Sequence, residues 1–110
     1  MSIKANLIID QGTDFSATID LMDGFDAPYD LTGFTVSSQM RKNFKSSTAV
    51  DFSATSNGVL GQIILSMSKT ITTDLDPGRY LYDVEITSAV DVTTRVVEGV
   101  VNVTPGITRT

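Results

Sequence analysis

The strongest constraint on the fold is a regular alternation of apolar and polar side chains in several short segments. Residues 14–22 place Phe15, Ala17, Ile19 and Leu21 on one side and polar residues on the other. A period of two residues is the pattern of a β-strand with one buried face. Val, Ile and Thr supply 35 of the 110 residues, whereas Lys and Glu supply six. This composition favours strands over helices.

Seven segments carry this alternation or a weaker form of it, and turn-forming residues separate them. The expected strands are residues 2–9, 14–22, 34–41, 49–55, 61–68, 79–87 and 94–103. The alternation stops at residues 69–75, where a single helical turn could bridge two sheets. Short strands and short turns, with no long helical pattern, predict an antiparallel sandwich over residues 1–105. Residues 106–110 are expected to form a C-terminal tail.

The turn before the sixth expected strand narrows this prediction. It reads Asp76-Pro77-Gly78-Arg79-Tyr80, in which proline fixes φ and glycine permits a positive φ. Either Tyr80 or Tyr82 could tuck its ring into the core and return its hydroxyl to a nearby backbone group. This arrangement is the tyrosine corner of immunoglobulin-like sandwiches. We therefore predict an all-β, immunoglobulin-like antiparallel β-sandwich of about seven strands.

Missing residue types exclude several classes of function. The chain has no His and no Cys, which removes Ser-His-Asp catalysis, thiolate nucleophiles and the usual zinc and copper ligands. Its formal charge of −5 repels a phosphate backbone. No apolar run approaches the ~18 residues of a membrane span, and the first residues do not form a secretory signal. We predict no enzymatic activity, no cofactor, no bound nucleic acid and no membrane partner.

One loop concentrates acidic residues, namely Asp20, Asp23, Asp26 and Asp30. Calcium prefers oxygen ligands, so such a cluster could hold one ion. The spacing does not match an EF-hand, and aspartates in turns commonly bond to their own backbone. We therefore predict a solvated turn and no metal site. The same loop carries Phe25 and Tyr29, which could cover the end of the sandwich or contact a partner or a sugar.

Two further groups of residues are candidate interfaces. The only basic cluster contains an aromatic residue and consists of Arg41, Lys42, Phe44 and Lys45. It is either a docking patch or the solvated end of a hairpin. An exposed apolar stripe is expected from Leu81, Val96 and Val100, as a subunit interface or a covered edge.

Four segments resemble a known family. They are residues 9–15 (Ile-Asp-Gln-Gly-Thr-Asp-Phe), residues 30–36 (Asp-Leu-Thr-Gly-Phe-Thr-Val) continuing to Gln39-Met40-Arg41, residues 75–84 (Leu-Asp-Pro-Gly-Arg-Tyr-Leu-Tyr-Asp-Val) and residues 95–99 (Arg-Val-Val-Glu-Gly). In order and spacing they are similar to small virion structural domains of tailed bacteriophages. That group includes domains similar to the N-terminal immunoglobulin-like domain of baseplate upper proteins. The resemblance implies a domain that docks other virion proteins and has no catalytic residues.

The expected function follows from this resemblance. Baseplate upper proteins continue into a receptor-proximal half, and no such half follows here, which favours an adaptor role. The chain is expected to be a virion structural protein, made in the host cytoplasm, that docks on tail, neck or baseplate components. Capsid-surface decoration and a carbohydrate- or surface-binding module are the alternatives. The expected partners are other phage virion proteins, with several copies on one particle or a homo-oligomer.

Overall fold

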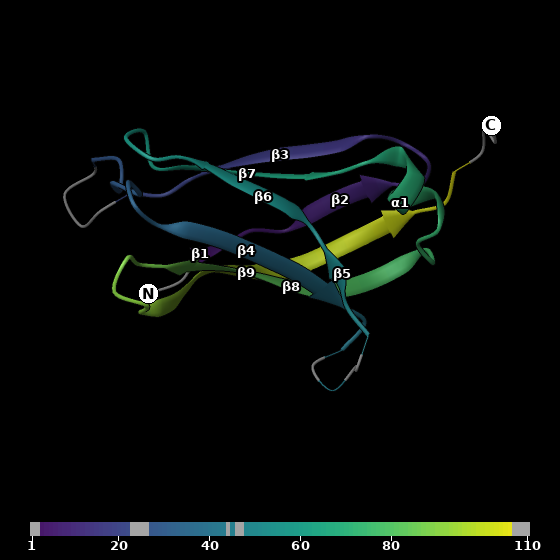
Figure 1. Cartoon of the computed structure of the whole chain (residues 1–110). Helices are drawn as coiled ribbons and strands as arrows, with labels where there is room; N and C mark the ends of the chain where they lie inside the picture. The colour runs from purple at the N-terminus through teal and green to yellow at the C-terminus, as the bar shows by residue number, and fades with distance from the viewer. Residues whose placement is uncertain (1–2, 23–26, 44, 46–47, 107–110) are drawn as a thin grey trace.

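The computed structural model describes residues 3–22, 27–43, 45 and 48–106. Within these residues nine strands and one short helix form two facing sheets (Figure 1). The elements are β1 (Ile3–Lys4), β2 (Leu7–Asp10), β3 (Phe15–Asp20), β4 (Thr35–Arg41), β5 (Val50–Asp51), β6 (Ser53–Asn57), β7 (Gln62–Met67), α1 (Lys69–Thr73), β8 (Gly78–Thr87) and β9 (Thr93–Thr104).

The larger sheet has six strands. Five of them follow the order β1-β9-β8-β4-β5, and the sixth, β2, pairs with the later part of β9, on the same side as β1. The smaller sheet has the order β3-β7-β6. The immunoglobulin-like sandwich predicted from the sequence is confirmed. One detail differs from a purely antiparallel arrangement, because β1 and β2 both run parallel to β9.

Two of the expected strands are each divided into two. The first is interrupted at Ala5 and Asn6, where the Asn6 Oδ1 accepts a hydrogen bond from the Val100 backbone N–H at 3.1 Å. A side-chain oxygen thereby takes the place of a backbone carbonyl in the ladder. The fourth expected strand is divided at Phe52, where the chain passes from the larger sheet to the smaller one. The Phe52 N–H still donates to the Ser38 carbonyl at 3.0 Å.

The core lies between the two sheets and consists of the inward side chains that the alternation predicted. Phe52 joins its two halves, because its ring lies 5.9 Å from that of Phe15 on the smaller sheet and 6.1 Å from that of Tyr82 on the larger one. The largest fully buried side chains are Ile9, Leu31, Met40, Ile63, Leu65, Ile86, Val84, Val97, Val101 and Thr72.

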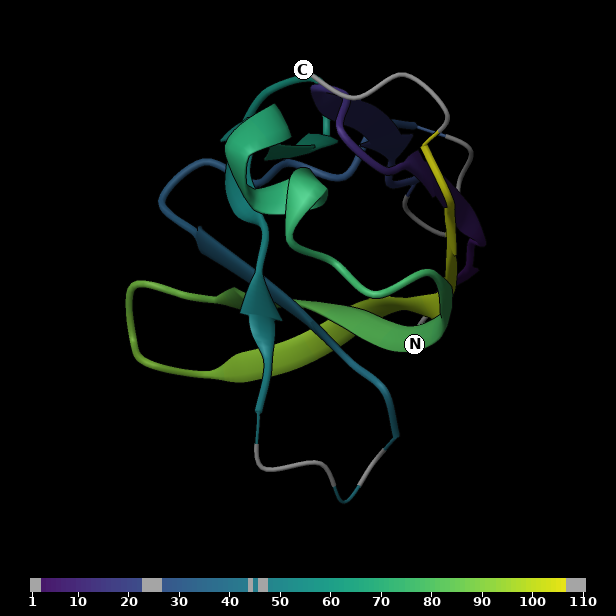
Figure 2. The ribbon, with the colours of Figure 1, turned by 90° about the vertical axis from the view of Figure 1, so that its right-hand side faces the viewer.

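The helical turn expected at residues 69–75 is present as α1, which lies at one end of the sandwich (Figure 2). Asp14 Oδ1 accepts the Lys69 backbone N–H at 2.8 Å and so satisfies one free amide at the helix start. Thr72 is fully buried and donates its hydroxyl to the Thr13 carbonyl at 2.7 Å. Two contacts from the loop between β2 and β3 therefore hold the helix in place. The described part of the chain holds no helix long and apolar enough for a bilayer.

The tyrosine corner is formed by Tyr80. Its hydroxyl donates to the Asp76 carbonyl at 2.9 Å, four residues upstream, and Gly78 takes the expected positive φ of 135°. The Tyr82 hydroxyl reaches a different place and donates to the Ala5 carbonyl at 2.6 Å. Tyr80 thus makes the local hydrogen bond of the tyrosine corner, and Tyr82 makes a long-range hydrogen bond to the first part of the chain.

The segment that follows β9 is bonded to the sandwich at Gly106, the first residue of the expected tail. Gln11 Nε2 donates to the Leu75 carbonyl at 2.9 Å, while Gln11 Oε1 accepts the Gly106 N–H at 3.0 Å. Gly106 is therefore still part of the sandwich. Residues 107–110 lie outside the described residues.

Candidate binding surface

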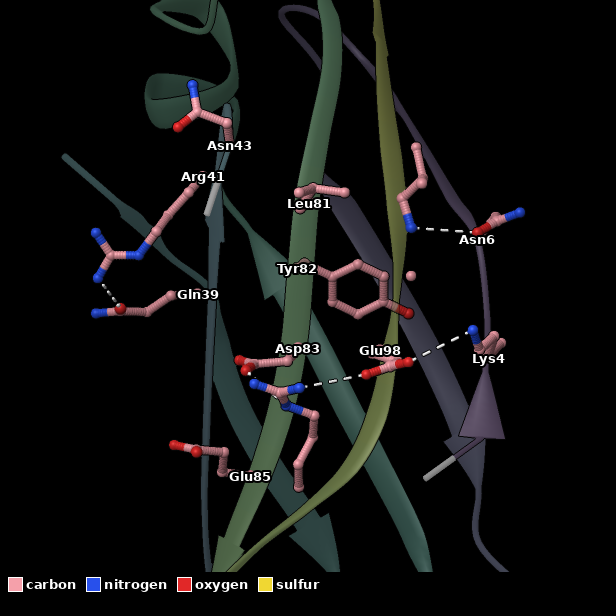
Figure 3. A pocket seen from close by; sticks show the side chains of 13 residues that line it. Lys4, Asn6, Gln39, Arg41, Asn43, Leu81, Tyr82, Asp83, Glu85 and Glu98 are labelled. Carbon is pink, nitrogen blue, oxygen red and sulfur yellow. Dashed lines mark hydrogen bonds and ion pairs between the residues drawn. The ribbon is translucent and has the colours of Figure 1, made fainter. Parts of the chain in front are cut away.

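A shallow groove of about 610 Å³ crosses the outer face of the six-stranded sheet (Figure 3). We call it the outer-face groove. The residues that line it lie on β1, β9, β8 and β4, or just beyond the ends of β1 and β4. The lining residues are Lys4, Asn6, Gln39, Arg41, Asn43, Leu81, Tyr82, Asp83, Glu85, Arg95, Glu98, Gly99 and Val100.

Its charges balance, unlike those of the whole chain. Three bases line the groove, and the same number of acids lie beside them: Lys4, Arg41 and Arg95 against Asp83, Glu85 and Glu98. The formal charge of −5 therefore resides on the rest of the molecule. An acidic partner, or a second acidic copy of this chain, therefore meets no net like charge at this groove.

Most of these charges form one continuous chain of ion pairs. Arg95 contacts Asp83 at 3.1 Å and Glu98 at 3.3 Å, and Glu98 also contacts Lys4 at 3.6 Å. This series of ion pairs forms a polar row across β8, β9 and β1 (Figure 3). Exposed pairs of this kind each contribute at most about 1 kcal/mol to stability. Their main consequence is to fix the direction of the charged groups.

Hydrogen bonds also orient the groups on the other side of the groove. Arg41 Nη2 donates to Gln39 Oε1 at 3.2 Å, and Gln39 Nε2 donates to Asp51 Oδ1 at 2.6 Å. The Arg41 guanidinium lies beside Gln39, on the side of the groove opposite to Lys4 (Figure 3). A cation consequently borders the groove opposite the Lys4 side.

The apolar part of the groove differs from the expected stripe. Leu81 and Val100 are direct cross-strand partners, but both are half-buried, whereas the sequence predicted an exposed stripe. Val96 does not join them, because it is only 8% exposed. The pairing passes from Val84↔Val97 to Glu85↔Arg95, which leaves Val96 as the extra residue of a β-bulge turned into the core.

The expected basic cluster does not form one patch. Arg41 lines the groove, whereas the Lys42 ammonium lies 4.3 Å from the centre of the Tyr80 ring. Consecutive residues at a strand end point to opposite faces, which separates these two cations. Lys45 is exposed in the following loop, and Phe44 lies outside the described residues.

The acidic loop has the local role that the sequence favoured where it is described. Asp30 Oδ1 accepts the Thr32 backbone N–H at 2.9 Å, and hydrogen bonds from the Thr32 side chain and backbone lower the pKa of Asp30. Asp20 is exposed, and Asp23 and Asp26 lie outside the described residues. The residues that the structure describes include no group of three His, Cys, Asp or Glu suited to a metal ion.

Tyr29 is half-buried, and its ring packs edge-on against Phe34 at 6.3 Å. It packs against the hydrophobic core, and its contact with a partner or a sugar stays a prediction. Phe25, its predicted companion, lies outside the described residues.

Several groove residues were not singled out in the sequence. Gln39, Asp83 and Glu85 occupy outward positions of predicted strands, so the alternation could have identified them. Lys4 and Asn6 could not be found in this way, because their place in the groove depends on pairing with β9, more than 90 residues away in the chain. Ile8 is also on the outer face and is 65% exposed, which the mixed pattern of its segment concealed.

Comparison with known proteins identifies the fold alone. No protein-family model and no curated protein matches the chain. Among solved structures, the Listeria monocytogenes internalin-like protein lmo2027 is 23% identical, with a TM-score of 0.53, over 94% of this chain and 28% of that one. The GspB Siglec domain is 16% identical, with a TM-score of 0.54, over 92% of this chain and 54% of that one. This chain thus spans about half or less of either structure.

Proposed function

We propose that this chain is a non-enzymatic docking module that uses the outer-face groove to attach to a protein partner. The observation that carries the proposal is the groove itself, in which oriented charges surround the apolar pair Leu81 and Val100. An apolar centre with a polar rim is the usual anatomy of a protein interface. The balanced charge removes the repulsion that this acidic chain would otherwise meet with an acidic partner.

The place of action that we propose is the tail, neck or baseplate of a tailed bacteriophage, where several copies would dock on other virion proteins. The four segments that resemble phage virion domains support this placement. In the fold these segments contribute to both sheets, to the tyrosine corner and to the groove. The resemblance therefore extends to residues that shape the proposed docking face.

The proposal excludes catalysis for a chemical reason. Of the three carboxylates in the groove, Asp83 and Glu98 contact Arg95, and Glu98 also contacts Lys4. The sequence supplies no His or Cys to act as a base or nucleophile beside them. The groove is therefore suited to recognition.

Incorporation into phage particles tests this function. The double variant Leu81→Asp/Val100→Asp places two uncompensated charges at the centre of the groove. We expect its copy number on purified particles, measured by quantitative mass spectrometry, to fall at least ~10-fold, as for a lost interface hot spot. Ser16→Asp/Thr18→Asp, on exposed positions of β3, is the matched control and should be incorporated normally.

Two results would contradict the proposal separately. Absence of the wild-type chain from purified particles removes the virion role. Normal incorporation of the folded Leu81→Asp/Val100→Asp variant removes the groove as the docking face. Thermal unfolding of both double variants shows whether each remains folded.

The composition of the groove also favours one alternative, a carbohydrate- or surface-binding module. Asn6, Gln39 and Asn43 carry amides that can bond to sugar hydroxyls, next to the apolar Leu81. A glycan array that compares the wild-type chain with Gln39→Ala/Asn43→Ala tests this role. Binding that the double variant abolishes supports it, and absence of binding excludes it. Capsid-surface decoration differs only in the partner, and cryo-electron microscopy of the particle distinguishes it from tail docking.

A further inference from the structure

One edge of the six-stranded sheet is only partly covered. β4 pairs with β8 along all seven of its residues, but β5 pairs with only Gln39 and Met40 on the other side. β5 lies at the end of β4 near its arrowhead (Figure 1). In the part of the chain that the structure describes, no strand is paired with this edge of β4 before Ser38.

The backbone of Val36 faces this open edge. The Ser38 carbonyl accepts the Phe52 N–H, so Ser38 directs its backbone groups away from β8. Backbone groups alternate between the two sides of an antiparallel strand. Val36, two residues earlier, therefore directs its own N–H and C=O to the same side. Unpaired backbone groups at a sheet edge, such as those of Val36, are a template for another strand.

A second hollow of about 460 Å³ lies along this edge. Its inner side is apolar and contains Val36, Phe52 and Ala54. Its charged residues, all acidic, are Asp51, Asp83 and Glu85. The hollow shares Gln39, Asp83 and Glu85 with the outer-face groove, but it extends to the β5 edge and its lining includes no basic residue.

Glu85 is the carboxylate best placed to receive a new cation. Its cross-strand partner Arg95 contacts Asp83 and Glu98 instead. Ser37 lies opposite Glu85 on β4, and its small side chain leaves space above it. Strands are spaced about 4.8 Å apart, so a lysine on a strand beside β4 can extend across Ser37 toward Glu85.

We propose that the open edge of β4 binds an extended peptide segment in which basic and apolar side chains alternate. The segment adds as a strand next to residues 35–37, up to the point where Phe52 bonds to Ser38, and continues the line of β5. Its apolar side chains face Val36 and Ala54, and its basic side chains face Glu85 and Asp51. Strand addition supplies the backbone hydrogen bonds, and the two faces of the hollow supply selectivity.

The sequence of this edge lacks proline, lysine and a bulge, which commonly protect against strand addition. Natural edge strands are commonly blocked by proline, lysine, a bulge or a covering segment. Residues 35–38 are Thr, Val, Ser and Ser, and they pair with β8 without a register shift. The edge is therefore suited to a partner strand, and this inference does not depend on Leu81 and Val100, the apolar centre of the outer-face groove.

NMR titration of the whole chain with designed peptides tests the proposal. The probe is an acetylated and amidated peptide of alternating lysine and valine, and the matched peptide has glutamate in place of lysine. We expect the lysine peptide to shift the amide signals of Val36, Ser37 and Phe52. The glutamate peptide should bind at least ~10-fold more weakly, because it faces like charges.

Two controls separate strand addition from general charge attraction. Glu85→Lys should weaken the lysine peptide about 3- to 10-fold, whereas Asp74→Lys, an exposed position next to α1, should leave its affinity unchanged. Two forms of the peptide, N-methylated at odd or at even positions, test the backbone bonds. One form should lose binding and the other should retain it, since only alternate amides face β4.

Three results would overturn the proposal. The first is equal binding of the lysine and glutamate peptides. The second is equal binding of the two N-methylated forms. The third is the absence of any shift at Val36 and Ser37 when the lysine peptide is raised to millimolar concentration.

Discussion

The Tyr82 hydroxyl donates a 2.6 Å hydrogen bond to the Ala5 carbonyl across 77 residues of sequence. Ala5 lies at the interruption between β1 and β2, where its own N–H donates to the Glu98 carbonyl at 3.1 Å. The bond therefore ties the first two strands to the centre of the larger sheet. Tyr82 also packs against Phe52, so one side chain connects the sheet edge with the core.

Removal of this hydroxyl should destabilise the edge. We expect Tyr82→Phe to lower the free energy of unfolding in urea by about 1–2 kcal/mol, since the partly buried Ala5 carbonyl loses its partner. Amide exchange at Leu7 and Ile9 should become faster. Tyr80→Phe breaks a bond within the tyrosine corner and should leave exchange in β2 unchanged. Equal exchange in the two variants would contradict the long-range role of Tyr82.

The pH dependence of stability should report the same residue. Burial raises the pKa of Tyr82 to about 12 from its ordinary value of 10. A raised pKa favours the neutral phenol in the folded state, so its contribution is complete below pH 10 and is lost as the pH rises through 12. Unfolding free energy should therefore fall in this interval. Tyr82→Phe should flatten the fall, and an unchanged profile would exclude Tyr82 as its origin.

Gly99 should not tolerate alanine. A Cβ at this position would overlap the Ala5 carbonyl and crowd the Tyr82 ring. We expect Gly99→Ala to lower the unfolding free energy by about 2–4 kcal/mol, because a backbone contact must open. Gly33→Ala is the control, since its φ is +84° but no atom lies within 4 Å of its added Cβ. It should cost about 1 kcal/mol, and a larger loss than in Gly99→Ala would refute the overlap argument.

The two neighbouring threonines of α1 offer a test of buried hydrogen bonding. Thr72 is fully buried and donates to Thr13, whereas Thr73 is exposed and donates to the Lys69 carbonyl at 2.7 Å. We expect Thr72→Val to cost about 1–3 kcal/mol in chemical denaturation, because the Thr13 carbonyl loses its buried partner. Thr73→Val should remain within about 0.5 kcal/mol of the wild type. Equal effects would show that burial does not set the cost.

Strand positions and inward faces could be predicted from the sequence because both depend on local alternation. Tyr80 and Val84 on β8, and Ile63 and Leu65 on β7, are all buried as the period of two requires. The helical turn also lies where the alternation stops. These features require no knowledge of which strands pair.

The features that escaped prediction depend on pairing over long distances. Val96 is buried because the pairing of β8 with β9 shifts register after Val84. The sequence of β9 gives no sign of this bulge, because valines occur on both sides of the predicted strand. Phe52 appeared to belong to one continuous strand, yet it marks the change of sheet. The outer-face groove required the contact of Asn6 with Val100, which local sequence does not encode.

The parallel pairing of β1 and β2 with β9 has a consequence for the kinetics of folding. Bonds such as that from Thr104 to Asp10 join residues 94 positions apart, so a large loop must close before this edge gains any stability. β1 and β2 have no strand partner until residues 93–104 are available to pair with them. Folding of this edge is therefore expected to be slow, in line with contacts of high sequence separation.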